Sequence, residues 1–424
     1  MLTRSMVVML LSLATACATA DEITLEPEHP TESGQDPVDV EGVDGVTEEA
    51  PDENGDTLFV TDKIHDIALS LPEASMDALR IDPRSYVPAT WTHEGETLQV
   101  GVRLKGNTSF TWFDEKPALI VDFDFAVPDQ RYRGVPSVYL QNMTWDPSMV
   151  HEHLAYWFFR QAQVPASRSA YTRLNIDGTS YGLYLLLEKQ NSLFRKQWWD
   201  DRSGSVYEAG SFNHPCDLSD GSDSDPCTCY EIDRVGEDSF TDLQDLCLAA
   251  RGLDADWQAA VAERVDWDVF LRAQASEMVV GHYDNYGWNI NNYRLYHEPT
   301  LGKFYWTPWS TDLAFGWYPW MNGAQCGTYA NTPDEYNGGH LIKRCWRDVD
   351  CASELRDAIS VQVDLLESVA MVTELDRVAE LIRADQSVDP RSRYTDTEAL
   401  AELSCVRDYV AGRPAGLRDW LARQ

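Results

Sequence analysis

The sequence predicts an α+β protein with two lobes, a β-rich first lobe over residues 57–190 and a mainly helical second lobe over residues 191–424. Apolar and polar residues alternate in three runs between residues 66 and 125, which is typical of half-buried strands. An Asp-Gly pair at 177–178 separates two further alternating runs and indicates a hairpin. Beyond residue 240, apolar residues mostly recur at helical spacing. Strands gathered before helices favour an α+β arrangement.

The first lobe combines strands with one helix. Pro147 suits the first turn of a helix over residues 147–163, and Asp146 just before it can cap the free backbone amides. The expected strands, including the two of the hairpin, are residues 66–71, 98–104, 118–125, 171–176 and 181–187.

The second lobe follows a loop rich in Gly, Ser and Asp, with three cysteines, over residues 210–229. Apolar residues then recur at helical spacing in five segments, and two short β-like runs lie between them. The helices are expected at 240–250, 254–264, 267–280, 353–383 and 395–421, and the β-like runs at 291–297 and 303–309.

Residues 1–20 predict an export signal. A positive residue precedes a short apolar run over residues 6–14, and small residues follow it. The run is too short to cross a bilayer, which takes about 20 apolar residues. Residues 13–17 resemble a bacterial lipobox, in which Cys17 is lipidated, whereas cleavage before Asp21 gives a plain secreted protein. We expect a lipoprotein of the cell envelope that meets the membrane through its lipid anchor only.

Residues 21–56 predict an acidic, disordered tether. They hold fourteen Asp or Glu residues and no Lys or Arg, so they bury too little apolar surface to offset the entropy of ordering. The whole chain has 70 Asp and Glu against 34 Lys and Arg, a formal net charge of −36. We therefore expect no nucleic-acid partner, because phosphate binding needs clustered positive charge.

The chain has nine cysteines, and eight remain when Cys17 is set aside. An even set in an exported chain predicts disulfides, although the spacing leaves their pairing open. Zinc is an alternative for Cys227-Thr228-Cys229, but no matching Cys-x-x-Cys pair accompanies it. The eight are Cys216, Cys227, Cys229, Cys247, Cys326, Cys345, Cys351 and Cys405.

The segment 281–289 carries the clearest chemistry. Asp284 and Asn289 are five positions apart, after an expected helix and before an expected β run. In a kinase catalytic loop with this spacing, the Asp accepts the proton of the substrate hydroxyl and the Asn gives an oxygen to magnesium. Asp312 follows the second β run, where a kinase has its other metal ligand, and such oxygens suit Mg²⁺ or Mn²⁺. The alternative is that Asp284 merely caps a loop.

Four segments follow one another in a recognisable order. Residues 102–109 read Val-Arg-Leu-Lys-Gly-Asn-Thr-Ser, with Lys116 soon after, and residues 140–148 read Leu-Gln-Asn-Met-Thr-Trp-Asp-Pro-Ser. Residues 175–188 form an Asn-Ile-Asp-Gly hairpin that continues through Tyr-Gly-Leu-Tyr to a final Glu. Residues 309–315 begin Trp-Ser-Thr-Asp at a strand end. Together these segments resemble the CotH family of atypical, protein-kinase-like proteins.

The resemblance implies a protein-kinase-like fold. Some CotH proteins phosphorylate serines of spore-coat proteins with ATP and a divalent metal. It also implies Asp284 as the catalytic base and Asn289 and Asp312 as metal ligands. The family usually has two acidic residues at the end of the last segment, and this chain departs from that pattern because Ser310 takes the first position.

ATP also needs cationic partners. Lys116 leads a strand directly after the Gly-Asn turn and is the first candidate for the phosphates, with Arg103 and Lys105 as alternatives. Glu152 lies early on a helix, where a kinase has the Glu that pairs with its Lys. Glu188 ends a long apolar strand, as the hinge between kinase lobes does. Each of these residues can instead be an ordinary strand or helix residue.

Two functions are open. One is an exported kinase that transfers the γ-phosphate of ATP to Ser or Thr hydroxyls of proteins. The other is a non-catalytic binding module on the same fold, such as a surface adhesin or a coat or matrix component. The kinase hypothesis requires Asp284, Asn289 and Asp312 to converge within roughly 8 Å in one cleft, with Lys116 entering from the β-rich lobe. His151 and His153, two positions apart on a helix, are expected to point apart and form no metal pair.

Overall fold

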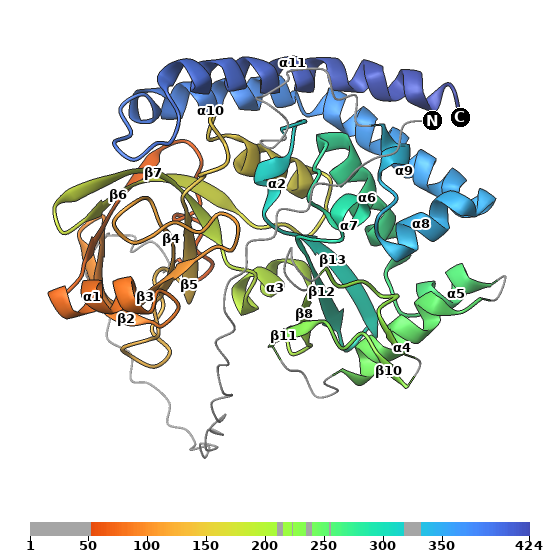
Figure 1. Ribbon diagram of the computed structural model, residues 1–424, viewed down its shortest axis with the longest axis horizontal. Helices are drawn as coiled ribbons and strands as arrows, with labels where there is room; N and C mark the ends of the chain where they lie inside the picture. Colours follow the sequence, from red (N-terminus) through yellow and green to blue (C-terminus); the bar gives the residue numbers. More distant parts are fainter. Residues whose placement is uncertain (1–51, 210–214, 223, 235–239, 254–255, 318–331) are drawn as a thin grey trace, which may run out of the picture. The chain divides into compact units, whose positions relative to one another are not determined.

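Seven strands close into a barrel, which forms the β-rich part of the chain (Figure 1). The strands follow the order β1-β2-β3-β4-β5-β7-β6, and a parallel pairing of β1 with β6 closes the ring. The other neighbours in the ring are antiparallel. The strands are β1 (Ile64–Ser70), β2 (Val87–His93), β3 (Glu96–Lys105), β4 (Ala118–Asp122), β5 (Ser137–Gln141), β6 (Ser169–Ile176) and β7 (Thr179–Glu188).

This computed structural model describes residues 52–209, 215–222, 224–234, 240–253, 256–317 and 332–424. They all belong to one unit. The predicted export signal, Cys17 and most of the predicted tether lie outside the described residues. The end of the tether segment contacts the barrel, because Arg168 donates hydrogen bonds to Asp56 at 2.8 Å and to the carbonyl of Asn54 at 2.7 Å.

Alternating side chains fill the barrel. In β1, Ile67 and Leu69 are buried and Asp66 is exposed, which is the period of two that a strand over a core produces. Trp91 of β2 packs edge-on against Phe123, with ring centres 5.1 Å apart. Strands were predicted from the sequence at the positions of β1, β3, β4, β6 and β7. Strands β2 and β5, helix α1 and the closure of the barrel were not predicted.

Helices dominate the second part of the chain, so an α+β fold with β-rich and helical parts is confirmed. A four-stranded sheet in the order β11-β8-β12-β13 lies among the helices (Figure 1). The helices are α1 (Glu73–Ile81), α2 (His151–Gln161), α3 (Ser192–Trp198), α4 (Thr241–Arg251), α5 (Trp257–Ala262), α6 (Trp267–Val280), α7 (Tyr286–Asn289), α8 (His340–Arg347), α9 (Val349–Ser368), α10 (Met371–Gln386) and α11 (Asp396–Leu421). The remaining strands are β8 (Val206–Glu208), β9 (Gly221–Ser222), β10 (Asp225–Pro226), β11 (Glu231–Arg234), β12 (Tyr293–Glu298) and β13 (Lys303–Pro308).

Asp146 organises the start of helix α2. Its two carboxylate oxygens accept hydrogen bonds from the backbone amides of Ser148 and His151, both at 2.8 Å. The residues between form a bend, so the helix begins at His151 and not at Pro147 as expected. The capping role of Asp146 is retained, because these amides precede or open the helix and have no partner within it.

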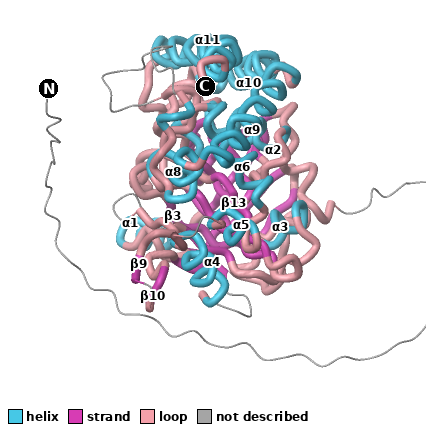
Figure 2. Tube along the Cα trace, turned by 90° about the vertical axis from the view of Figure 1, so that its right-hand side faces the viewer, coloured by secondary structure: helices cyan, strands magenta, loops and turns pink. Residues whose placement is uncertain are grey.

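The last two helices lie along one side of the protein, beside the barrel and the helical part (Figures 1 and 2). α10 contacts β7 and α2, and α11 contacts α6 and α9. The single helix expected at 353–383 is divided between α9 and α10 by Ala370, whose φ of 50° is left-handed. The carboxy-terminal helices therefore connect the two parts of the fold.

Disulfides are present, as the cysteine count predicted. The bonded pairs are Cys216–Cys229, Cys227–Cys247 and Cys345–Cys351, and Cys405 is also disulfide-bonded. Cys227 and Cys229 bond to different partners, so neither is free to hold zinc. Cys326 lies outside the described residues. Among the helices in the described ranges, none combines the length and the apolar character needed to cross a membrane.

Candidate active site

A cavity of about 360 Å³ lies between the barrel and the four-stranded sheet. β3 and the loop 106–109 after it line one side, and residues of β12 and of the segment 309–313 line the other. The volume is within the range of small-molecule sites, about 300–1,000 Å³. The charged residues that line it are Arg103, Lys105, Lys189, Glu208, Glu231, Asp284, Arg294 and Asp312.

Side-chain amides hold the carboxylate of Asp284. Its Oδ1 accepts a hydrogen bond from Asn289 at 2.6 Å, and its Oδ2 accepts from Asn291 at 3.1 Å and from Asn292 at 2.7 Å. Helix α6 leads to this residue and ends at Gly281, whose left-handed φ of 64° stops the helix. The carboxylate therefore has a fixed orientation at the edge of the cavity.

Asp312 faces the same cavity from the short 3-10 helix Thr311–Leu313 that follows β13. The hydroxyl of Ser310 donates to its Oδ1 at 3.1 Å. Burial raises the pKa of the Asp312 carboxyl, and the negative charge of Asp284 raises it further. Two carboxylates that repel each other in one cavity are stabilised by a cation between them, so the pair suits a divalent metal.

The side-chain amides that line the cavity belong to Asn291 and Asn292, whereas Asn289 was the amide expected there. Asn289 is exposed and does not line the cavity, although it binds Asp284 directly, whereas Asn291 and Asn292 do line it. A half-turn of an amide exchanges its nitrogen for its oxygen, so Asn292 can present an oxygen beside Asp284. Kinase spacing singled out Asn289. The adjacent Asn pair before β12 was the signal that could have found Asn292.

Lys116 does not enter the cavity, and this expectation is corrected. Its ammonium donates to Asp389 at 2.7 Å, with side-chain exposures of 6% and 0%. Asp389 belongs to the loop between α10 and α11. Because a buried carboxylate already neutralises its charge, Lys116 anchors the carboxy-terminal helices and is not placed to bind a nucleotide.

Lys105, at the end of β3, lies where the phosphate-binding lysine was expected. Its ammonium donates to Gln141 at 2.6 Å, and the amide of Gln141 donates to Glu152 at 3.1 Å. Burial lowers the pKa of Lys105, and burial raises the pKa of Glu152, with each charge opposing the shift of the other. Glu152 is thus linked to Lys105 through the side-chain amide of Gln141. In kinases the corresponding lysine and glutamate pair directly.

Aromatic rings lie among the cations of the cavity. The ring centre of Trp309 is 5.3 Å from the ammonium of Lys105 and 4.7 Å from the guanidinium carbon of Arg294. Tyr139 lies 4.9 Å from the same ammonium. Arg294 donates to Glu208 at 3.0 Å. Arg294 was not predicted from the sequence, because only the register of β12 against β8 places it opposite Glu208.

Of the other two residues predicted to bind nucleotide, Arg103 lines the cavity and Glu188 does not. The carboxylate of Glu188 accepts hydrogen bonds from Arg168 at 2.7 Å and from Gln197 at 2.6 Å. These contacts use the carboxylate within the protein, so Glu188 has a structural role. The next residue, Lys189, lines the cavity instead.

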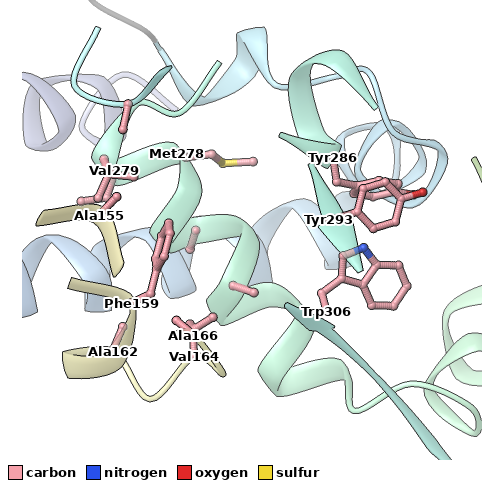
Figure 3. Packing of buried hydrophobic residues seen from close by; sticks show 14 of the residues in the cluster. Ala155, Phe159, Ala162, Val164, Ala166, Met278, Val279, Tyr286, Tyr293 and Trp306 are labelled. Atoms are coloured by element: carbon pink, nitrogen blue, oxygen red, sulfur yellow. The ribbon is translucent and has the colours of Figure 1, made fainter. Parts of the chain in front are cut away.

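Buried packing fixes the helix that leads to Asp284. Met278 and Val279 of α6 belong to the same hydrophobic cluster as Ala155 and Phe159 of α2 (Figure 3). Since α2 also carries Glu152, this packing fixes the end of α6, which leads to the loop of Asp284, against the helix that holds the partner of Lys105.

A buried histidine–glutamate contact lies at the start of the same loop. The Nδ1 of His282 is 2.6 Å from the carboxylate of Glu277. Burial lowers the pKa of His282, but Glu277, Asp284 and Asp312 outweigh burial and raise it. When this imidazole is protonated, its positive charge reduces the mutual repulsion of the two cavity carboxylates.

A family model described as CotH kinase protein matches residues 102–417, well over half of the chain. The chain belongs to this family. One solved structure, titled "Crystal structure of A Helicobacter pylori proinflammatory kinase CtkA", is similar to the CotH chain with a TM-score of 0.33 and 9% sequence identity. That similarity covers 69% of this chain and 92% of the other, and its TM-score is too low to carry an argument. No curated protein matches the CotH chain significantly.

The segments that resemble the CotH family lie in two different parts of the structure. Those at 102–109 and 309–315 line the cavity. Lys116 and Gly182 instead meet Asp389. Gly182 has a left-handed φ of 95°, and a Cβ at this position would lie 2.2 Å from Asp389 Oδ1. One part of the family pattern therefore builds the candidate site, and another part docks the α10–α11 loop on the barrel.

Proposed function

We propose that this CotH chain is a protein kinase of kinase-like, two-lobed design that transfers the γ-phosphate of ATP to Ser or Thr hydroxyls with Mg²⁺ or Mn²⁺. One observation carries the proposal. Asp284 and Asp312 face a cavity that also holds Lys105, and Lys105 is linked to Glu152 on α2 through Gln141. Phosphoryl transfer needs this combination of paired acids and a positioned cation. Membership of the CotH kinase family supports it.

The residues of the cavity fit a metal–nucleotide complex. When bound, ATP and its metal supply the phosphoryl group and the positive charge that phosphoryl transfer requires. Asp312 and Asn292 offer the carboxylate and amide oxygens that Mg²⁺ prefers. Lys105 and Arg103 offer positive charge on the opposite, barrel side, beside the loop 106–109.

Asp284 then accepts the proton of the substrate hydroxyl. The residue is only partly buried, so a hydroxyl of another protein can approach it. Its hydrogen bonds to Asn289, Asn291 and Asn292 hold the carboxylate in one orientation before the substrate arrives. Such preorganisation lowers the barrier, because the group does not have to reorient during the reaction.

Phosphate transfer to an acceptor protein tests the proposal. The chain from residue 21 onward is mixed with γ-labelled ATP, Mg²⁺ or Mn²⁺, and casein as a Ser/Thr-rich acceptor. We expect labelled casein with the wild type and a loss of roughly 100-fold or more with Asp284→Asn, which keeps the shape but removes the base. Undiminished transfer by Asp284→Asn would contradict the proposed mechanism.

Ser310 favours a second candidate, a binding module without catalysis. A hydroxyl replaces the acidic group that CotH proteins usually have there, and it donates to Asp312 in place of binding metal. Thermal unfolding with ATP and Mg²⁺ separates the two candidates, since a ligand that binds only the folded state raises the melting temperature. A rise below millimolar ATP supports the kinase. No rise up to millimolar ATP leaves the binding module.

We also propose that the chain is exported and anchored through lipidated Cys17, with a protein as its substrate. The disulfides support export, because disulfides persist in oxidising compartments. We expect Cys17→Ala to move the protein from the membrane fraction to the soluble fraction and to abolish labelling by palmitate. An unchanged membrane fraction would contradict the anchor.

A further inference from the structure

Two histidines of α2 each pair with a glutamate of the carboxy-terminal helices. The Nε2 of His151 is 3.1 Å from Glu402 of α11, and the Nε2 of His153 is 3.3 Å from Glu374 of α10. Both imidazoles are buried, with exposures of 0% and 2%. They point to different partners, as their spacing on the helix predicts. Both are histidine–glutamate pairs, yet of the two only the His151 pair also contacts a residue of the candidate site.

His151 contacts the metal-ligand segment directly. Its Nδ1 is 3.0 Å from the backbone carbonyl of Asp312, and its Nε2 faces Glu402 and, at 3.7 Å, Asp146. Both ring nitrogens therefore face oxygen atoms, one on each side of the ring. The ring thereby bridges α11 to the backbone of Asp312.

The helix at the other end of this bridge is itself fixed. Arg413 of α11 donates to the carbonyls of Met278 at 2.5 Å and Val279 at 3.1 Å, at the end of α6. The last carbonyls of a helix lack the amides that would follow in a longer helix, and a cation at a helix carboxy terminus is favourable. The backbone amide of Phe315 also donates to Val280 at 2.7 Å. α11, the end of α6 and the Asp312 segment therefore form one connected frame.

We propose that α11 positions the metal ligand Asp312 through the Glu402–His151 bridge. Glu402 and His151 are positioning residues, because they act on the backbone of Asp312 and do not line the cavity themselves. This inference rests on the proposed function, since it concerns metal binding by Asp312. In metal sites, residues that orient the ligands set metal affinity by about 10- to 100-fold when they are lost.

The matched variants are Glu402→Gln and Glu374→Gln. Each replaces the carboxylate of a buried His–Glu pair between α2 and a carboxy-terminal helix. Glu374 also binds Arg377 at 2.5 and 2.7 Å, so its replacement should cost at least as much stability. Only Glu402 is connected to Asp312. His151→Gln is a second test of the same bridge.

The measurement is the Mg²⁺ concentration that gives half of the maximal phosphate transfer at fixed, saturating ATP, together with the melting temperature of each variant. We expect Glu402→Gln and His151→Gln to raise this concentration about tenfold, with smaller losses of rate at saturating Mg²⁺. Glu374→Gln should stay within about twofold of the wild type. If Glu402→Gln or His151→Gln loses more stability than Glu374→Gln, the Mg²⁺ dependence of the other of these two variants tests the bridge.

Equal Mg²⁺ dependence of Glu402→Gln, His151→Gln and wild type would overturn this inference and leave the proposed function intact. An equal shift in Glu374→Gln would also overturn it, because general loosening of α2 would then suffice. A wild type without metal-dependent transfer would overturn the proposed function and, with it, the inference.

Discussion

The ammonium of Lys116 lies 2.7 Å from the carboxylate of Asp389, and neither side chain is more than 6% exposed. The same carboxylate accepts hydrogen bonds from the backbone amides of Leu183 and Arg391, both at 2.8 Å. A buried charge pair is stable only when such additional donors satisfy the carboxylate. This contact therefore fixes the α10–α11 loop on the barrel, and neither of its residues lines the cavity of the candidate site.

Replacing Lys116 by Met should destabilise the protein without weakening nucleotide binding. The change leaves Asp389 buried without its cation, which typically costs about 3–5 kcal/mol. Urea unfolding measures the loss. The double variant Lys116→Met/Asp389→Leu is the control, because it removes both charges and should recover most of the stability. A loss below about 1 kcal/mol in the single variant would show that solvent or another group neutralises Asp389.

Replacing Lys105 by Met should have the opposite effect. The melting temperature should change little, because Glu152 can take up a proton when its positive neighbour is absent, as its raised pKa indicates. The rise in melting temperature caused by ATP and Mg²⁺ should be lost, because the cavity loses the ammonium that faces the phosphates. Lys116→Met is the control in the same assay and should keep its ATP-dependent rise. A rise retained only by Lys105→Met would reverse the roles given to the two lysines.

Replacing Gly182 by Ala should loosen the same docking contact from the barrel side. The φ of 95° is unfavourable for any residue with a Cβ, and the added carbon would lie 2.2 Å from Asp389 Oδ1. Strained backbone and displaced loop together should cost roughly 2–4 kcal/mol. Gly178→Ala is the matched control. Its φ is 79°, but nothing lies within 4 Å of the added carbon, so it reports the backbone strain alone.

Asn292→Ala should weaken metal binding more than Asn289→Ala. Both amides donate to Asp284, but only Asn292 lines the cavity. Removing a metal ligand or its immediate support should raise the Mg²⁺ concentration for half-maximal transfer by about tenfold or more. The Asn289 variant should show mainly a lower rate at saturating Mg²⁺, because it supports only the base. A larger shift in Mg²⁺ dependence for Asn289→Ala than for Asn292→Ala would show that Asn289 is the metal ligand, as kinase spacing predicted.

Acid should destabilise the barrel through His93. This ring is 1% exposed, contacts His65 at 3.0 Å and Tyr132 at 2.7 Å, and burial lowers its pKa to about 4. Above pH 6.5, the ring is neutral in both the folded and the unfolded protein, so its burial does not lower the free energy of unfolding. Between pH 6.5 and 4, the unfolded chain binds a proton that the folded protein does not, so stability falls with pH.

The loss should be on the order of 2 kcal/mol between pH 7 and pH 4. Urea unfolding at several pH values measures it. His93→Gln removes the titrating group and should give a flatter dependence over this range. The same slope in wild type and His93→Gln would assign the acid sensitivity to other groups.

Local pattern predicted the strands and the main helices, because alternation and helical spacing are set by which face meets the core. It could not predict that β1 pairs in parallel with β6 to close a barrel, since this pairing joins residues about 107 positions apart without a turn signal, as in His65 opposite Thr172. β2 was missed for another reason. Its buried face ends in His93, and Thr90 and Thr92 lie on the opposite face, so the end of the strand resembles a polar segment in sequence.

The candidate site shows the same limit. Asp284 and Asp312 were found because the distance in sequence between a loop acid and a strand-end acid reflects the chemistry of kinases. Which lysine faces the nucleotide depends on which strand end lies at the cavity, and the sequence does not reveal this. The end of β3 lines the cavity, so the lysine there is Lys105 and not Lys116. Kinase spacing likewise chose Asn289. Only the left-handed turn at Ile290 and Asn292 brings the second amide into the cavity.

The partner of Lys116 is added to the chain 273 residues later. During synthesis, the strands of the barrel are complete at Glu188, but one of their lysines has no counter-charge until the α10–α11 loop has been made. A polypeptide that stops before Asp389 therefore leaves Lys116 without its ion pair, and leaves this face of the barrel without the loop that packs on it. Truncated products should open more readily and be degraded sooner, which restricts the stable population to full-length copies.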